Sequence, residues 1–209
     1  MSGDLAGQLW AGNAELARRI LRHPFVQGLG QGSLPGTAFC GYVAQDAYFL
    51  ESFARAYALA IAHSTDRDSL VAFSELLQGV LEELQLHAAY ASRWRIDLSA
   101  ITPLPATTAY TDFLLATARG GDCGLICAAM TPCLRLYAWL GQQLRAQVGH
   151  PAHAYAEWID TYADPAFEAL ARRLEHLLNR LAPPGEAVEK TYRRAMELEL
   201  AFFDAHAPR

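Results

Sequence analysis

Residues Ile126–Leu144 read ICAAMTPCLRLYAWLGQQL, a stretch that is apolar nearly all round, with Arg135 as its single charge. A helix that is apolar on almost every face is buried, so we expect a central core helix here. Asp122 follows two glycines and is placed to cap the first free amides of this helix. Steps of three and four residues put one stripe on a single face: Ile126, Met130, Cys133, Tyr137, Leu140 and Leu144.

Cys133 and Tyr137 lie one turn apart on this predicted helix and face the same way. Pro132 has no amide hydrogen and leaves one carbonyl unpaired, which predicts a kink beside the cysteine. Such a kink opens room for a ligand next to the thiol. The alternative is that Cys133 is an ordinary core residue on a bent helix.

The composition of the chain limits its class. It has 209 residues, 52% hydrophobic and 19% charged, enough for one domain with a large core. The net charge of −5 argues against a nucleic-acid-binding surface. The N-terminus has no basic segment before a long apolar run, so we expect no signal peptide, and no stretch predicts a membrane span.

The cysteines indicate a reducing compartment. Three of the four fall in one helical stretch, where neither disulfide nor zinc-site spacing is natural. They are Cys40, Cys123, Cys127 and Cys133. We therefore predict a cytoplasmic protein without a bound metal.

Helical spacing runs through the whole sequence and strand signals are absent, which predicts one all-α domain over residues 1–209 with about seven or eight helices. A glycine-rich loop is expected over Gly28–Gly36. The expected helices cover Asp4–Leu21, Thr37–His63, Asp66–Trp94, Thr107–Arg119, the central helix to Val148, Ala154–Thr161, Pro165–Leu181 and Glu186–Ala205.

Two of these helices carry a carboxylate in the middle of an apolar face. Asp46 lies among aromatic and aliphatic residues of the second helix, and Glu199 lies on the apolar stripe of the last helix. Glu197 points the opposite way and should be solvated. Burying an ionised carboxylate without partners costs several kcal/mol, so each needs a partner or a cavity. Arg55, Arg135 or tyrosine hydroxyls are the structural alternative. On this basis, Asp46→Asn should leave the protein at least as stable as before.

Other residues are candidates for the walls of a site. Glu83 and His87 are one turn apart at the edge of an apolar stripe. Helical di-iron sites need two Glu-x-x-His pairs, which this chain lacks, so a hydrogen-bonded imidazole at the core edge is the better interpretation. The aromatic residues that could line one pocket and offer flat faces to a planar ring are Phe49, Tyr110, Tyr137 and Tyr162.

An ordered set of segments covers nearly the whole chain and is more specific than any one of its members. The segments are His23-Pro24-Phe25-Val26, Gly32-Ser33-Leu34-Pro35, Phe39–Leu50 (FCGYVAQDAYFL), Glu83–His87, Thr108-Ala109-Tyr110-Thr111, Pro132-Cys133 with Tyr137, Trp158–Tyr162 and Glu199–Phe203. Together they resemble the TenA family (thiaminase II, aminopyrimidine aminohydrolase), and Cys133 matches its cysteine-containing branch. Two positions depart from the family pattern. Ala47 stands where a bulkier aromatic is common, and Phe202-Phe203 replaces the frequent Phe-Trp, so the pocket and its substrate choice are expected to differ.

The resemblance implies a heme-oxygenase-like helical bundle, a homotetramer, and hydrolysis of a small aminopyrimidine in thiamin salvage without a cofactor. It implies that Cys133 adds to the electron-poor pyrimidine carbon bearing the leaving amine. It implies that Asp46 binds a ring nitrogen and the exocyclic amine of the substrate. It also implies that Glu199, held by Tyr110, carries out the proton transfers. Supporting roles fall to Phe49, Tyr137 and Tyr162 as stacking or hydrogen-bonding groups, with Glu83 and His87 behind them.

Two other functions remain open from the sequence. A non-catalytic pyrimidine-binding protein would keep Asp46 and the aromatic residues and would tolerate loss of Cys133. A metal- or heme-dependent oxidase on the same fold would need Glu83, His87, Asp46 and Glu199 around one metal. The sequence also leaves open whether thiamin or a degraded aminopyrimidine is the better substrate.

Overall fold

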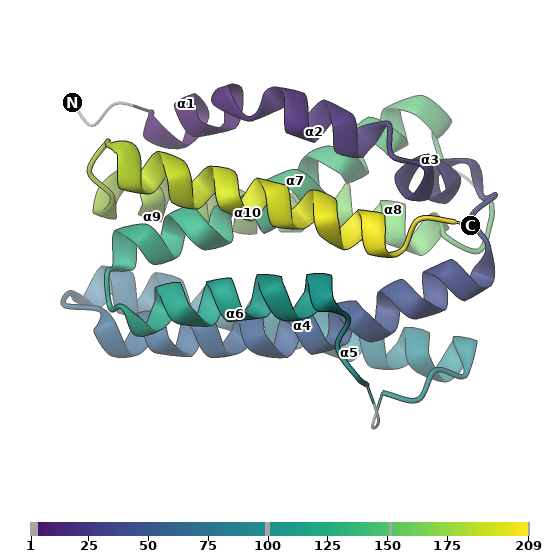
Figure 1. Cartoon of the computed structure of the whole chain (residues 1–209), viewed down its shortest axis with the longest axis horizontal. Helices are drawn as coiled ribbons and strands as arrows, with labels where there is room; N and C mark the ends of the chain where they lie inside the picture. The colour runs from purple at the N-terminus through teal and green to yellow at the C-terminus, as the bar shows by residue number, and fades with distance from the viewer. Residues whose placement is uncertain (1–3, 99–100, 151, 209) are drawn as a thin grey trace.

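The computed structural model describes residues 4–98, 101–150 and 152–208, and these contain ten α-helices and no strand (Figure 1). The all-α prediction is confirmed, although the helices outnumber the seven or eight expected. They are α1 Leu5–Gly12, α2 Ala14–Leu21, α3 Pro24–Gln31, α4 Gly36–His63, α5 Arg67–Trp94, α6 Pro105–Arg119, α7 Cys123–Val148, α8 Ala156–Tyr162, α9 Pro165–Leu181 and α10 Glu186–Ala205.

Helix α7 is the central element, as its sequence predicts. Asp122 caps it by accepting a hydrogen bond from the Leu125 amide at 3.0 Å. The predicted stripe is buried except for Cys133, which is partly exposed. Arg135, the charged residue of this stretch, forms ion pairs with Glu168 and Glu175 of α9, with N···O distances of 2.8 and 2.6 Å. The helix runs unbroken through Pro132.

The long helices lie side by side along the long axis of the molecule, and α7 packs mainly on α9 and α10 (Figure 1). Helix α4 packs mainly on α5 and α6. Helices α6 and α10 also contact each other, so the two groups of helices meet along their length. The inward faces of α4, α5, α6, α7 and α10 therefore share one interior, and this is where the site lies.

The first predicted helix, Asp4–Leu21, is in fact two helices. The break falls at Asn13, between α1 and α2. Its side-chain amide donates to the carbonyl oxygen of Leu9 at 2.8 Å, the group that a continuous helix would pair with the backbone amide of residue 13. A short polar side chain that competes in this way favours a helix end.

The predicted loop over Gly28–Gly36 is wrong in its first half. Helix α3 continues to Gln31, and the chain leaves the helix only at Gly32, whose φ of 73° is left-handed. Gly30 serves close packing here, because a Cβ at this position would lie 2.8 Å from Leu144 of α7. Glycine in this segment therefore marks a helix–helix contact as well as a turn.

By length and composition alone, α7 could cross a membrane, contrary to the expectation that no stretch reaches this limit. Its most apolar window is 72% buried inside the fold, however. A core helix of a soluble protein passes the same test, and the packing of α7 against four or more neighbouring helices agrees with that interpretation.

Candidate active site

Three polar residues that the sequence places on apolar faces meet in the interior. Asp46 comes from α4 and Glu199 from α10, and they are only 4% and 1% exposed. Cys133 comes from α7 and keeps some accessible surface, although it packs against the core. The charges of Glu199, Glu83 and Asp46 all act on its thiol. The fold thus gathers one thiol and three carboxyl groups.

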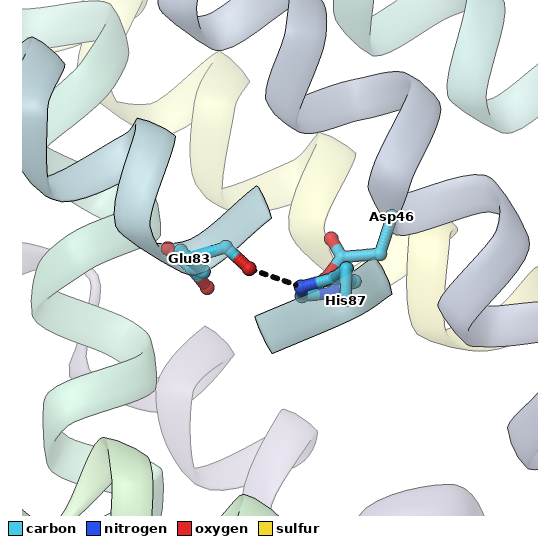
Figure 2. Close-up of side chains that lie close together, drawn as sticks. All are labelled: Asp46, Glu83 and His87. Carbon is cyan, nitrogen blue, oxygen red and sulfur yellow. Dashed lines mark hydrogen bonds and ion pairs between the residues drawn. The ribbon is translucent and has the colours of Figure 1, made fainter. Parts of the chain in front are cut away.

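Asp46 has a buried histidine as its partner (Figure 2). His87 Nε2 donates to Asp46 Oδ2 at 2.7 Å, and His87 Nδ1 donates to the backbone carbonyl oxygen of Glu83 at 3.0 Å. A carbonyl oxygen and an ionised carboxylate can only accept hydrogen bonds, so both ring nitrogens of His87 act as donors. This favours a ring that carries both protons. Burial by itself lowers the pKa of His87, but the hydrogen bond and charge of Asp46 outweigh it and raise the pKa to about 9. His87 is therefore an imidazolium near neutral pH, and it is paired with the Asp46 side chain.

This arrangement corrects the placement of His87 at the edge of the core, because the residue is only 2% exposed. It also decides among the structural partners considered for the buried carboxylates. Arg55 pairs with the exposed Glu51 of its own helix, and Arg135 pairs with α9. Asp46 is thus paired by a histidine, a residue type outside the predicted alternatives.

Asp46, Glu83 and His87 each offer a potential metal ligand, and these atoms lie within 4.8 Å of one another. However, both ring nitrogens of His87 are already hydrogen-bonded, Nε2 to Asp46 and Nδ1 to the backbone carbonyl oxygen of Glu83. The oxidase alternative also required Glu199, which is not part of this group among the described residues. The donor set fits the ion pair seen here better than the four-residue centre of that alternative.

The second carboxyl group, Glu199, lies beside the thiol. Tyr110 of α6 donates its hydroxyl to Glu199 Oε1 at 2.7 Å. Burial raises the pKa of Glu199 to about 8, despite the opposing effects of Tyr110 and Cys133. Burial and the surrounding carboxyl groups also hold the pKa of the Cys133 thiol well above its usual range. Both groups are therefore mainly protonated at pH 7, and the thiol needs a base to become a nucleophile.

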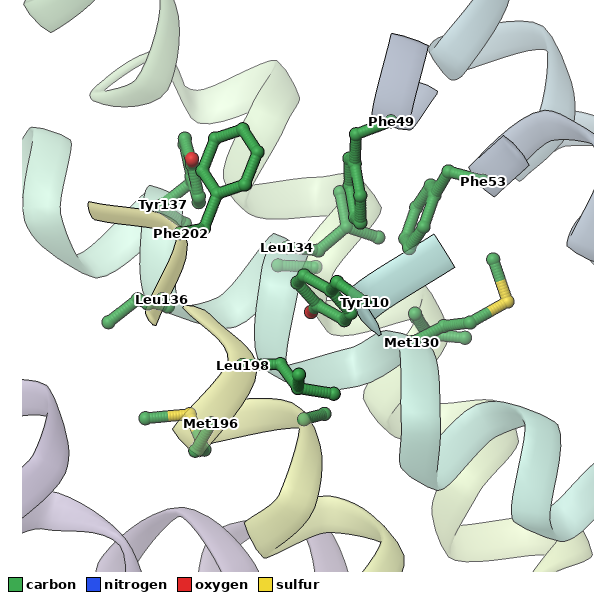
Figure 3. Close-up of a cluster of buried hydrophobic side chains, with 14 of the residues drawn as sticks. Phe49, Phe53, Tyr110, Met130, Leu134, Leu136, Tyr137, Met196, Leu198 and Phe202 are labelled. Carbon is green, nitrogen blue, oxygen red and sulfur yellow. The ribbon is translucent and has the colours of Figure 1, made fainter. Parts of the chain in front are cut away.

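Aromatic rings line the same interior, and Figure 3 shows several of them. Phe49 lies against Tyr110, with ring centroids 4.7 Å apart. Tyr137 lies against Tyr162, with ring centroids 4.9 Å apart. Phe202 of α10 faces Phe49 at 6.1 Å. All four residues predicted to line a pocket are thus brought into one interior region, in two pairs contributed by α4, α6, α7 and α8.

Two further residues belong to this region and were not singled out from the sequence. Trp158 Nε1 donates to the Tyr42 hydroxyl at 3.3 Å, and Tyr42 donates to the Tyr137 hydroxyl at 3.2 Å. This chain of bonds orients the Tyr137 hydroxyl. A signal for Tyr42 exists in the sequence, because it lies one turn before Asp46 on the same face of α4.

Glu83 closes the region on the side of α8. The Tyr162 hydroxyl donates to Glu83 Oε1 at 2.6 Å. Burial raises the pKa of Glu83 to about 7, since the nearby Asp46 adds to this effect while His87 and Tyr162 only partly oppose it. Glu83 is therefore the third carboxyl group of the site, in contact with a tyrosine that lines it.

Gly141 fixes the position of α8 and with it Tyr162. A Cβ at residue 141 would lie 2.4 Å from the carbonyl carbon of Tyr162 and 2.6 Å from the amide nitrogen of Ala163. Because these are backbone atoms, we expect Gly141→Ala to push α8 away and to lower the unfolding free energy by about 1–3 kcal/mol. Urea unfolding monitored by circular dichroism measures this change.

Gly12→Ala is the matched control for this substitution, because nothing lies within 4 Å of a Cβ at that position in α1. It should be neutral or stabilising by up to about 1 kcal/mol. Equal effects of the two substitutions would contradict the close approach of α7 and α8.

The fold and the site together define a class of protein. It is an all-α, heme-oxygenase-like bundle with a buried thiol among carboxyl groups and aromatic rings. The chain belongs to the TENA/THI-4/PQQC family, whose model matches residues 10–207. A solved structure of a TenA family transcription regulator from Silicibacter sp. superposes with a TM-score of 0.89 at 29% identity, covering 97% of this chain and 96% of that one.

Curated relatives extend this finding. The aminopyrimidine aminohydrolase of Halalkalibacterium halodurans is 38% identical, over 80% of this chain and 77% of that protein. The mitochondrial bifunctional TH2 protein of Arabidopsis thaliana is 36% identical over 96% of this chain. This chain spans only 37% of the Arabidopsis protein and 28% of a thiamine biosynthesis multifunctional protein of Corynebacterium efficiens.

Proposed function

We propose that this protein is a hydrolase of thiamin salvage that replaces the amine of an aminopyrimidine by a hydroxyl group and that also cleaves thiamin. The observation that carries the proposal is the Cys133 thiol beside the buried Glu199 carboxyl group, which Tyr110 holds at 2.7 Å. The name of the Halalkalibacterium relative supports the same reaction class.

In this proposal, Asp46 binds the pyrimidine. Its Oδ2 is fixed by His87, and the remaining lone pairs of the carboxylate are available to a ring N–H and an exocyclic amine. The Asp46 carboxylate, held by the His87 side chain in a buried place, favours a protonated, electron-poor ring. Phe49 and the tyrosine rings give the flat walls that a planar ring needs.

Cys133 then acts as the nucleophile. Its proton passes to a neighbouring carboxylate, and the sulfur adds to an electron-poor carbon of the ring. The bond between the amine nitrogen and its carbon breaks as Glu199 gives a proton to the departing amine, and water then forms a bond to the same carbon and returns a proton to Glu199. Expulsion of the sulfur restores the ring, and the sulfur takes its proton back from the carboxylate to restore the thiol. The net reaction consumes one water and releases one ammonia for each pyrimidine alcohol formed.

The organisation of the chain follows from the same proposal. We propose one domain over residues 1–209, a cytoplasmic location, and the homotetramer that the family resemblance implies. The four free cysteines support a reducing compartment. Large apolar side chains exposed on α5, namely Leu70, Val71 and Leu81, supply a surface for contact between copies.

The test is to incubate the purified protein with 4-amino-5-aminomethyl-2-methylpyrimidine and, separately, with thiamin. Chromatography of the pyrimidine alcohol and a coupled assay for ammonia follow the reaction. We expect release of both products in equal amounts from the aminopyrimidine. Saturable binding without product would favour the binding-module alternative, and activity that depends on added iron or heme would favour the oxidase.

Asp46→Asn tests the pairing with His87. The substitution removes the counter-charge of a buried imidazolium, so we now expect a loss of about 3 kcal/mol or more in unfolding free energy, the reverse of the expectation from sequence. Substrate binding and turnover should weaken together, since the amide offers one acceptor and no charge. Urea unfolding and steady-state kinetics measure these effects.

The pKa of His87 also predicts how the effect of Asp46→Asn on stability changes with pH. The folded-state pKa of His87 is raised from 6.5 to about 9, so the pair stabilises the fold fully below pH 6.5 and loses this contribution as the pH rises through 9. The difference between the parent and Asp46→Asn should therefore be larger at pH 6 than at pH 9.5. A difference that is constant over this range would contradict a charged pair.

A further inference from the structure

A surface pocket of about 440 Å³ lies between α5, α8 and α9. Its lining residues include Gly79, Glu83, Thr161, Ala166, Phe167 and Leu170. Glu83 is partly exposed and belongs both to this pocket and to the group that it forms with the buried Asp46 and His87. Four further pockets on the described surface are lined by residues outside the site. The pocket is therefore an open space that reaches a residue of the site.

The wall between the pocket and the interior is thin. Tyr162 donates to Glu83 at 2.6 Å, and its ring stands perpendicular to that of Phe167, a pocket residue, with centroids 4.9 Å apart. On the inner side the Tyr162 ring contacts Tyr137, one turn from Cys133. Two side chains joined by one hydrogen bond, Glu83 and Tyr162, thus separate the pocket from the surroundings of the thiol.

The charge of the pocket favours the entry of cations. Its lining residues include four carboxyl groups and no lysine or arginine. Asp160 is paired with Arg145, and Asp164 caps α9. Glu82 and Glu83 of α5 accept hydrogen bonds from the uncharged side chains of Gln78 and Tyr162, which do not neutralise a carboxylate. A concave surface of one sign raises the local concentration of the opposite ion. An alkyl amine, such as the aminomethyl group of the proposed substrate, is a cation near neutral pH.

We propose that this pocket is the passage by which a protonated amine reaches Cys133, and that Glu83 receives its ammonium group at the inner end. To do so, Glu83 exchanges the Tyr162 hydroxyl for the charged donor, which makes the stronger hydrogen bond. Tyr162 then turns toward the site. The identity of the amine rests on the proposed function, whereas the passage itself does not.

The passage is tested by filling it. Ala166 lines the pocket and is exposed in the first turn of α9, so Ala166→Trp places an indole in the mouth without touching the site. Ala169→Trp is the matched control, because Ala169 is exposed on the same helix and lines a different pocket of about 420 Å³. The readout is the rate at which neutral methyl methanethiosulfonate modifies Cys133.

Fragment-ion mass spectrometry of the tryptic peptide 120–135 locates the modified sulfur, with the partly exposed Cys123 in the same peptide as an internal standard. We expect Ala166→Trp to slow modification of Cys133 by about tenfold relative to Cys123 and Ala169→Trp to leave it unchanged. Equal rates in the two variants would overturn the passage.

The role of Glu83 is tested with a cationic reagent of similar size, 2-aminoethyl methanethiosulfonate. Glu83→Gln keeps an acceptor for Tyr162 but removes the charge. We expect the rate ratio of the cationic to the neutral reagent at Cys133 to fall about fivefold or more in Glu83→Gln. In Glu82→Gln it should fall by less than about twofold, because Glu82 is exposed and its charge is screened by solvent and salt. An unchanged ratio in Glu83→Gln would refute the ammonium contact. If the reagents behave as expected and no aminopyrimidine is hydrolysed, the passage stands and the proposed function fails.

Discussion

Cys133→Ser is expected to reduce turnover of the aminopyrimidine by roughly 10³-fold, to near the background rate. A serine hydroxyl is a far weaker nucleophile than a thiol near neutral pH, and Glu199 is too weak a base to ionise it. The fold should be unaffected, because the two side chains have similar shapes and Cys133 is already partly exposed. Steady-state kinetics and thermal unfolding of the purified variant measure both effects.

Cys123→Ser is the control for this result. Cys123 lies on the same helix and is also partly exposed, but its sulfur contacts the carbonyl oxygen of Ala60, away from the site. Its activity should equal that of the parent. If Cys133→Ser retains more than about a tenth of the parent activity, the covalent role of the thiol is wrong and a non-covalent hydrolysis must replace it.

Glu199→Gln is expected to lower turnover by about 10²-fold or more, the usual contribution of a general acid–base group. The amide oxygen still accepts the hydrogen bond of Tyr110, so the shape of the site is kept while proton transfer is lost. The effect should fall on kcat more than on KM, since the proposed role of Glu199 lies in the chemical steps.

The same substitution should stabilise the fold near neutral pH. The pKa of Glu199 is raised from 4.5 to about 8, so its contribution to stability is fully present below pH 4.5 and is lost as the pH rises through 8. In Glu199→Gln this loss does not occur, so the unfolding free energy at pH 7 should exceed that of the parent by at most about 3 kcal/mol. Lower activity together with higher stability is the signature we expect; loss of both would indicate a structural role instead.

Glu197→Gln is the matched control two residues away. Glu197 is exposed on α10 and makes only surface ion pairs, with Arg193 at 3.4 Å and Arg194 at 3.7 Å. Its substitution should change stability by no more than about 0.5 kcal/mol and leave the rate unchanged. A larger effect for Glu197→Gln than for Glu199→Gln would show that the catalytic role has been assigned to the wrong residue.

The sequence predicts most helix boundaries, because the signals that set them are local. Asp66 and Asp164 cap α5 and α9 by accepting amide hydrogen bonds at 2.8 and 2.7 Å, as their positions before the helices indicate. The two larger errors, the break at Asn13 and the unpredicted helix α3, which runs through Gly30, have other causes. The side chain of Asn13 competes for a backbone carbonyl, and the glycine at position 30 allows the close approach of α7.

The sequence also places the reactive groups on buried faces. Helical periodicity separates Glu199 from Glu197 and puts Asp46 and Cys133 inward, and the exposure of these residues in the fold agrees. What periodicity cannot give is the partner of a buried group. The predicted partners of Asp46 were arginines or tyrosine hydroxyls, and His87 was predicted only to support the site from behind. Their direct pairing does not follow from periodicity, because the two residues lie on different helices.

The sequence by itself therefore determines the all-α class, the central helix and the inward faces, since repeats of three and four residues and helix caps act over a few residues of the chain. Only the tertiary structure decides how the site is connected. The bonds His87–Asp46, Tyr162–Glu83 and Tyr110–Glu199 join residues 41, 79 and 89 positions apart. Such contacts depend on how whole helices pack, and they fix which carboxyl group is paired with an imidazolium, which stays protonated by burial, and which faces the pocket.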